Sequence, residues 1–252
     1  MGEIMLDRRQ FVGLTAASAL APALLPRAAV AQAWPSRFVR LVVPYASGGP
    51  TDAVARVVAD PLARAWGQQV VIENKGGAGT NIGAEAVARS DPDGYTLLVG
   101  SSALAMNRAL YRTLSYDAIA DFVPVTLIVS FSFFMCVPNS SPAKSVKEFI
   151  AYAKDKGGKL TYATPGVEAG VPGFEVSSFY GLFLPIRTPA DIVRKINADT
   201  VTALADPPIK GRLEQLGYAV IGSTAEDLAA HLQSEIDKWG PVIKGAGIRI
   251  DS

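Results

Sequence analysis

Residues that commonly carry out catalysis are scarce in this chain of 252 residues. It has one histidine, His231, and one cysteine, Cys136, which excludes an internal disulfide and a histidine- or cysteine-rich metal site. No Gly-x-Ser-x-Gly nucleophile elbow occurs. His231 follows a helical pattern and Cys136 lies in an apolar run, so a surface imidazole and a packed thiol are the favoured interpretations. We therefore predict no catalytic residue, no metal site and no cofactor.

The loop at residues 44–52 is the first candidate site, and it reads Pro-Tyr-Ala-Ser-Gly-Gly-Pro-Thr-Asp. It joins an expected strand to an expected helix. Glycines let backbone amides approach a ligand closely, and the free N–H groups and dipole at a helix start favour an anion. Asp52 either caps the helix or hydrogen-bonds a hydroxyl, amine or water of a ligand. On residue chemistry alone, an ordinary tight turn explains the loop equally well.

Two further loops follow expected strands. The segment 76–83 carries glycines that loosely resemble a dinucleotide fingerprint, but the spacing has one residue too many. The next strand ends in Gly100-Ser101 without an acid that could bind a ribose, so a nucleotide site is disfavoured. Ser101 and Ser102 supply hydroxyls at that strand end, where they either line a pocket or cap the next helix.

The elements that position these loops alternate between strand and helix. β-Branched runs predict strands, and apolar residues at i, i+3, i+4 and i+7 predict helices. The first half reads as strands at 38–43, 70–73 and 95–100 with helices at 52–66 and 81–89. This alternation predicts a parallel sheet with helices on both faces, and open sheets of this kind bind ligands at the carboxyl ends of their strands.

The second half is less regular. The apolar run 122–138 predicts one bent strand or two short ones. Further elements are expected as helices at 145–156, 188–204 and 206–216 and strands at 160–163, 176–184 and 218–221. Thr188 is the predicted cap of its helix. Ser223 and Glu226 are the predicted capping box of the final helix.

The N-terminal 33 residues have the parts of a signal peptide. Arg8-Arg9 precede a charge-free stretch from Val12 to Leu25, and small residues offer cleavage sites before Trp34. The paired arginines resemble a twin-arginine signal, with the ordinary secretory route as the alternative. The apolar stretch is short for a membrane span, so an uncleaved anchor is the less favoured interpretation. The chain is therefore expected to be periplasmic.

The charge balance excludes one class of partner. The chain has 24 basic and 23 acidic residues, and residues 1–33 contain three of the former and two of the latter. The remainder is therefore neutral by formal charge. A nucleic-acid partner is excluded, because it requires a concentrated positive surface. Any preference for an anion must come from a local site.

Several motifs together resemble the tripartite tricarboxylate transporter receptors, also called the Bug family. They are Arg40–Tyr45, Gly48–Asp52, Glu73–Lys75, Gly77–Ala84, Asp91–Leu98, Gly170–Ser178 and the stretch from Trp239 to Gly247. The resemblance covers nearly all of the chain after the signal. It implies an α/β, periplasmic-binding-protein-like (type II) fold with parallel-rich sheets, in which two lobes close around a ligand. It also implies a membrane permease as partner.

The resemblance assigns a ligand site. Its first loop falls on Tyr45 through Asp52, whose backbone amides would hold a ligand carboxylate. Ser101-Ser102 match a second element, and the second-lobe loop begins at 162–166. The expected ligand-binding residues are Tyr45, Ala46, Ser47, Gly48, Gly49, Pro50, Thr51, Asp52, Ser101, Ser102 and Thr164.

The resemblance breaks after Gly166, where relatives continue with several strands and helices before the segment at 170–173. We therefore expect a truncated second lobe at 124–175, with the first lobe formed by 34–123 and 176–252. Closure depends on ligand contacts from both lobes, so the missing block predicts weak binding or none. The expected function is that of a monomeric receptor delivering a tricarboxylate, dicarboxylate, amino acid or aromatic acid to its permease. The alternative is a secreted α/β enzyme acting on a small anion.

Overall fold

The computed structural model describes residues 34–133, 137–157 and 177–250. The chain divides into two compact units at Ser36/Arg37, and the unit from Arg37 onward is described below. The predicted signal peptide, Cys136, the predicted strand at 160–163 and Thr164 all lie outside the described residues. Within the described ranges, no helix has the length and apolar character needed to cross a membrane.

One six-stranded sheet organises this unit, in the order β2-β1-β3-β5-β4-β6. β1 pairs in parallel with both β2 and β3, whereas the β3–β5, β5–β4 and β4–β6 pairs are antiparallel. The strands are β1 Val39–Val43, β2 Val70–Asn74, β3 Thr96–Ser101, β4 Phe122–Ser132, β5 Ser177–Pro185 and β6 Ala219–Val220. The sheet is therefore mixed, and the predicted parallel arrangement holds for its first three strands.

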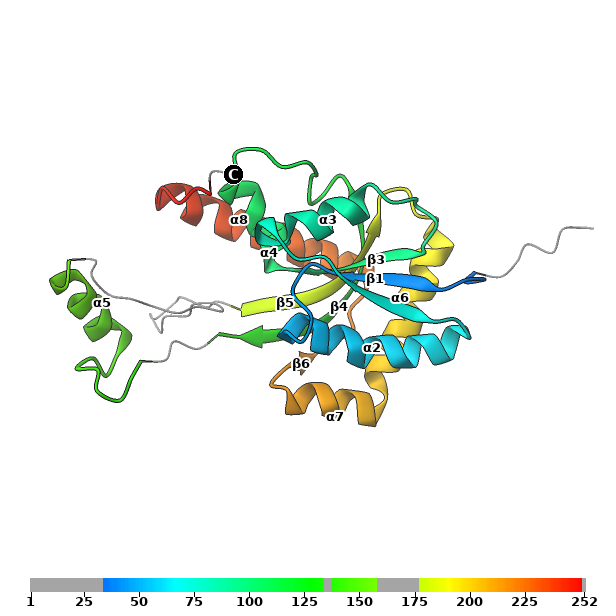
Figure 1. Ribbon diagram of the computed structural model, residues 1–252, viewed down its shortest axis with the longest axis horizontal. Helices are drawn as coiled ribbons and strands as arrows, with labels where there is room; N and C mark the ends of the chain where they lie inside the picture. The colour runs from blue at the N-terminus through cyan, green and yellow to red at the C-terminus, as the bar shows by residue number, and fades with distance from the viewer. Residues whose placement is uncertain (1–33, 134–136, 158–176, 251–252) are drawn as a thin grey trace, which may run out of the picture. The chain divides into compact units, whose positions relative to one another are not determined.

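Helices lie on both faces of the sheet, as the sequence predicts (Figure 1). α2, α6 and α7 lie together on one face, and α3, α4 and α8 lie on the other. The helices are α2 Pro50–Trp66, α3 Asn81–Ala88, α4 Ser102–Leu110, α5 Val146–Asp155, α6 Ala190–Ala205, α7 Pro207–Gln215 and α8 Ala225–Gly245, with a 3₁₀ turn η1 at Ala78–Thr80. α2 continues through Pro61 as a single helix.

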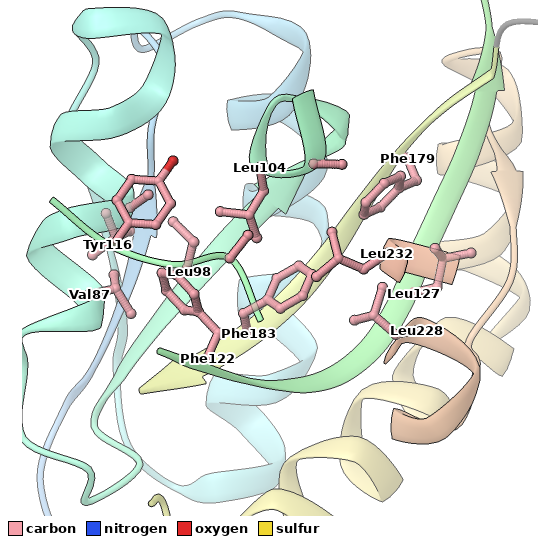
Figure 2. Packing of buried hydrophobic residues seen from close by; sticks show 14 residues of the cluster. Val87, Leu98, Leu104, Tyr116, Phe122, Leu127, Phe179, Phe183, Leu228 and Leu232 are labelled. Atoms are coloured by element: carbon pink, nitrogen blue, oxygen red, sulfur yellow. The ribbon is translucent and has the colours of Figure 1, made fainter. Parts of the chain in front are cut away.

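An aromatic core joins the parallel and antiparallel halves of the sheet (Figure 2). Phe122 meets Tyr116 and Phe183 edge to face, with ring centroids 5.8 and 6.4 Å apart. Leu228 and Leu232 of α8 pack into the same cluster. Each such buried side chain contributes about 1.5–3 kcal/mol. The strand ends that carry the candidate loops therefore rest on a rigid base.

β4 differs from its prediction in extent and in partners. It is one strand with two register shifts against β5, which accounts for the predicted bend. Residues 124–132, assigned from the sequence to the second lobe, pair within this sheet, so the predicted boundary at 123/124 falls inside a strand. Of the remainder of that predicted lobe, α5 is described and is capped by Ser145, whose Oγ accepts from the N–H of Glu148.

Two predicted helix caps are wrong by one residue. α8 is capped by a box formed by Thr224 and Asp227, because Ser223 is occupied by β4: its Oγ accepts from the N–H of Leu127 at 2.9 Å. α6 has Pro189 at the N-cap, and the Thr188 hydroxyl donates to the carbonyl of Pro185 at 2.7 Å. In both cases a tertiary or turn contact competes with the local capping pattern.

Candidate functional site

The loops after β1 and β3 lie at the same edge of the sheet, because these strands are parallel neighbours. From β1 the chain passes through α2 to β2 on one side, then crosses back through α3 to β3 on the other (Figure 1). The boundary between β1 and β3 is thus a topological switch point. Open α/β sheets bind ligands at such points, outside the carboxyl ends of the strands. The topology brings together two of the three predicted site elements.

A hydrogen bond joins these two loops directly. The phenol Oη of Tyr45 lies 2.7 Å from Oγ of Ser101. Ser101 is also the N-cap of α4, where its Oγ accepts from the N–H of Ala103 at 3.3 Å. Burial raises the pKa of Tyr45 above its ordinary value of 10.0, so the phenol is neutral at physiological pH. The pair fixes the spacing of the two loops with uncharged groups.

Both carboxylate oxygens of Asp52 accept hydrogen bonds from described residues of the protein. Its side chain is 3% exposed, and it accepts from the N–H of Gly48 at 2.9 Å and from Nε of Arg56 at 2.8 Å. Nδ2 of Asn74 donates to its other oxygen, also at 2.9 Å. The hydrogen bond from Arg56 is the largest cause that lowers the pKa of Asp52, to about 2. The ionised carboxylate therefore holds the ligand loop in shape.

The tip of the loop is exposed, whereas Thr51 and Asp52 in the first turn of α2 are buried. Ala46, Ser47 and Gly48 are exposed, and Gly48 has a φ of +81°. The first N–H of α2 bonded to a carbonyl four residues back is that of Ala53, which donates to Gly49. Pro50 has no N–H, so Thr51 and Asp52 carry the donors of the first turn. Two N–H groups that were predicted to be available to a ligand are bonded within the loop: that of Gly48 donates to Asp52, and that of Gly49 donates to the carbonyl of Ala46 at 3.4 Å.

Sequence reasoning missed two residues that shape this loop. Asn74, at the end of β2, donates to the carbonyl of Tyr45 at 3.2 Å as well as to Asp52. Arg56 lies four residues after Asp52, the spacing at which helical side chains meet. That spacing was visible in the sequence, whereas the contact from Asn74 depends on the pairing of β2 with β1.

The two serines after β3 face different surroundings. Both are buried; the Ser101 hydroxyl contacts Tyr45 of the ligand loop, whereas the Ser102 hydroxyl lies 2.8 Å from that of Ser178 in β5. The structure thus brings together Tyr45 to Asp52 with Ser101, and it places the Ser102 hydroxyl inside the fold.

The second glycine loop is fixed by buried amides. Nδ2 of Asn107 donates to the carbonyl of Gly79 and to Oδ1 of Asn81, both at 2.7 Å. The Tyr116 hydroxyl donates to the same Oδ1 at 2.8 Å. These side chains serve the loop itself, so the network is structural.

An aromatic cluster adjoins the first turn of α2. The ring of Phe131 lies 4.9 Å from that of Tyr180 and 5.4 Å from that of Tyr218, centroid to centroid. The Tyr218 hydroxyl reaches the carbonyl of Pro50 at 3.5 Å, and Tyr180 lies near the side chain of Thr51. We call Phe131, Tyr180 and Tyr218 the aromatic wall. Phe131, which lies in the apolar run 122–138, is half-buried, and sequence reasoning did not identify either tyrosine.

Comparison with known families decides the assignment. A model of the tripartite tricarboxylate transporter family receptor matches residues 54–170 and 166–248. The chain belongs to this receptor family. The two matched segments meet at 166–170, where the sequence predicts that the resemblance breaks. Membership in a family of transport receptors, which are binding proteins, also decides against the secreted enzyme.

Three solved structures share the fold of this receptor. The periplasmic binding protein BugD is 26% identical, with 86% of this chain and 100% of that chain covered and a TM-score of 0.75. Rpa4515 of R. palustris, solved with adipate, is 28% identical with 86% and 100% covered and a TM-score of 0.74. MatC from Rhodopseudomonas palustris, with bound malate, is 28% identical with 83% and 100% covered and a TM-score of 0.72.

A curated relative shows that this receptor is shorter internally. The UPF0065 protein in the tcbD-tcbE intergenic region of Pseudomonas sp. (strain P51) is 27% identical over 297 positions, covering 86% of this chain and 88% of the relative. Since 86% of 252 residues is about 217, about 80 positions inside that alignment face no residue of this chain.

Proposed function

We propose that this protein is a periplasmic receptor that binds a small carboxylate and presents it to the membrane permease of a tripartite tricarboxylate-type transporter. The observation that carries the proposal is the loop Tyr45–Asp52, which begins a helix at the switch point of the sheet. Two relatives of this fold are described with adipate and with malate, both dicarboxylates. Tripartite transport itself is named in the description of the family.

We place the ligand carboxylate against the exposed residues Ala46 to Gly48, beside the first turn of α2, where Thr51 and Asp52 are buried. The amides of Thr51 and Asp52 and the helix dipole supply positive potential there without a lysine or arginine. Asp52 acts on the ligand indirectly, since its carboxylate is bonded to Gly48, Arg56 and Asn74. Its negative charge is offset by Arg56, so the loop can still accept an anion. Ser101 adds a hydroxyl at the second loop.

Localisation and partner follow from the same reasoning. The paired arginines and the short apolar stretch within residues 1–33 are typical of an export signal, and BugD, a relative of the same fold, is a periplasmic binding protein. A chain exported in this way would meet its permease at the outer face of the inner membrane. We propose that it acts as a monomer, as the sequence interpretation has it.

Affinity is expected to be low, because the positions that this chain lacks relative to its relatives remove part of a second binding surface. Ligand contacts from one lobe alone stabilise a complex less than contacts from two. Thr164, the one predicted contact from the second lobe, lies outside the described residues. Binding in the millimolar range corresponds to about 4 kcal/mol, which a few hydrogen bonds to one carboxylate can supply.

Titration of the ¹⁵N-labelled mature chain with malate and adipate tests the proposal. We expect saturable amide shifts at Ala46, Ser47, Thr51 and Asp52, with no matching shifts in α8. The matched control is the uncharged diol butane-1,4-diol, which should shift none of them. The proposal fails if neither dicarboxylate shifts the loop amides at concentrations up to about 20 times a millimolar dissociation constant.

A further inference from the structure

The aromatic wall and the ligand loop share residues, so one ligand can touch both. Tyr218 contacts the carbonyl of Pro50, and Tyr180 lies near Thr51. Pro50 and Thr51 are the first two residues of α2, whose N–H end is the proposed carboxylate site. A carboxylate held at that turn leaves the carbon body of the ligand within reach of the rings beside it.

The wall has the geometry of a surface on which a flat group packs. Phe131 meets Tyr218 edge to face, whereas Tyr180 is tilted by 42° to Phe131 and lies 5.9 Å from Tyr218. Phe131 and Tyr218 are half-buried, whereas Tyr180 is buried, and the ring of Phe133 packs edge to face on that of Phe131 with the centroids 5.4 Å apart. Offset and edge-to-face arrangements are those in which a further aromatic ring is favoured.

The side chains of the wall are uncharged, so they offer no partner to a second carboxylate of the ligand. Among the described residues, the cation–π contacts involve Tyr95, Tyr152 and Trp239, and none involves a ring of the wall. A second or third carboxylate placed against these rings would lose hydration that the uncharged rings do not replace. The cost of burying an unpaired charge exceeds the contribution of a ring contact.

We propose that Phe131, Tyr180 and Tyr218 select the body of the ligand, and that the receptor therefore prefers a carboxylate with a flat aromatic body. This inference rests on the proposed function, because it assumes that the carboxylate binds at the first turn of α2. The inference goes beyond the proposed function because it names the ligand class and the side chains that discriminate between ligands. A second copy of the chain is the competing occupant of the rings.

Three probes and two variants separate the possibilities. Benzoate and cyclohexanecarboxylate have the same carboxylate and the same carbon count, and adipate is the acyclic control. We expect the mature wild-type chain to bind benzoate about 3- to 10-fold more tightly than cyclohexanecarboxylate. Phe131→Leu should abolish this difference, whereas Phe38→Leu, at the other end of β1, should retain it.

Nuclear Overhauser contacts between benzoate protons and the Phe131 ring in the wild type give a test that needs no variant. Their presence supports the proposal even where Phe131→Leu does not fold, and their absence at saturating benzoate overturns it. If adipate binds and benzoate does not, this inference fails and the proposed function stands. If no carboxylate binds, both fail. A dimer in sedimentation that Phe131→Leu dissociates assigns the wall to a second copy and overturns the inference.

Discussion

The phenol of Tyr45 and the hydroxyl of Ser101 meet at 2.7 Å across the gap between the loops that follow β1 and β3. These residues are 56 positions apart in the sequence, and the parallel pairing of their strands brings them together. Since each hydroxyl can donate, the pair needs no charge to hold the two loops at a fixed spacing. A ligand that binds at this edge therefore meets a preformed arrangement.

A double-mutant cycle measures this contact. Tyr45→Phe removes the phenol hydroxyl, and Ser101→Ala removes its partner together with the cap of α4. We expect the two variants to be coupled by about 0.5–1.5 kcal/mol in the free energy of unfolding, measured with urea. The cost of the lost cap appears in Ser101→Ala alone and cancels in the cycle. Additive effects of the two substitutions would show that the hydroxyls do not interact.

Gly48 offers a second test, because its φ of +81° lies in the left-handed region where a side chain is strained. A Cβ at Gly48 would meet no atom within 4 Å, so the cost is conformational. We expect Gly48→Ala to lower the free energy of unfolding by about 1 kcal/mol.

The matched control is Gly211→Ala, in the middle of α7, where a Cβ also meets no atom within 4 Å. There the helical backbone suits alanine, and we expect a gain of about 0.5–1 kcal/mol. Thermal unfolding of both variants should thus give shifts of opposite sign. Equal shifts for the two variants would mean that backbone conformation is not the cause.

Local patterns in the sequence predicted the elements of the first half well. Strands β1 and β3 and helix α2 follow from β-branched runs, helical periodicity and the glycine loop between them. These patterns involve only neighbouring residues, so they can be recognised without knowledge of the fold. The Asp52–Arg56 pair belongs to the same class and could have been recognised from its spacing.

The parts that sequence reasoning missed depend on long-range pairing. β5 lies between β3 and β4, an order that no local pattern specifies, and this placement brings Tyr180 next to the ligand loop. Tyr218 reaches Pro50 over 168 positions. Competing contacts also made the predicted helix caps wrong. Ser223 fits the pattern of a helix cap, but its Oγ accepts a hydrogen bond from the N–H of Leu127 in β4. The candidate loop was therefore predictable, whereas the wall beside it was not.

Asn107 is expected to be one of the more costly positions to substitute. Its amide donates to the carbonyl of Gly79 and to Oδ1 of Asn81, so Asn107→Ala removes the donor to Gly79 and leaves Oδ1 of Asn81 with the Tyr116 hydroxyl alone. Unsatisfied buried groups cost about 1–3 kcal/mol, and we expect a loss of that size in urea unfolding. Thr202→Ala, which removes an exposed hydroxyl bonded to Ala198, is the control and should change stability by less than about 0.5 kcal/mol. A comparable loss in both variants would contradict the structural role of the network.

The last prediction concerns the dependence of stability on pH through Asp52. Its folded-state pKa is lowered from 3.8 to about 2, chiefly by the hydrogen bond from Arg56. A lowered pKa means that the carboxylate stabilises the fold above the unfolded value. This contribution is present at pH 7 and is lost as the pH falls from about 4 towards about 2. Asp52→Asn should therefore cost about 1–3 kcal/mol at pH 7, because a buried charged acceptor is removed.

The difference between wild type and Asp52→Asn should shrink at pH 3 and nearly vanish at pH 2, as measured by urea unfolding at each pH. Glu85→Gln is the matched control, since Glu85 pairs with Arg89 at the same i,i+4 spacing but is 38% exposed. That variant should differ from wild type by less than about 0.5 kcal/mol at any pH. A pH-independent cost for Asp52→Asn would mean that shape, rather than charge, is what Asp52 contributes to the ligand loop. In that case, Arg56→Gln, which removes the charged partner, should leave the stability of the loop unchanged at pH 7.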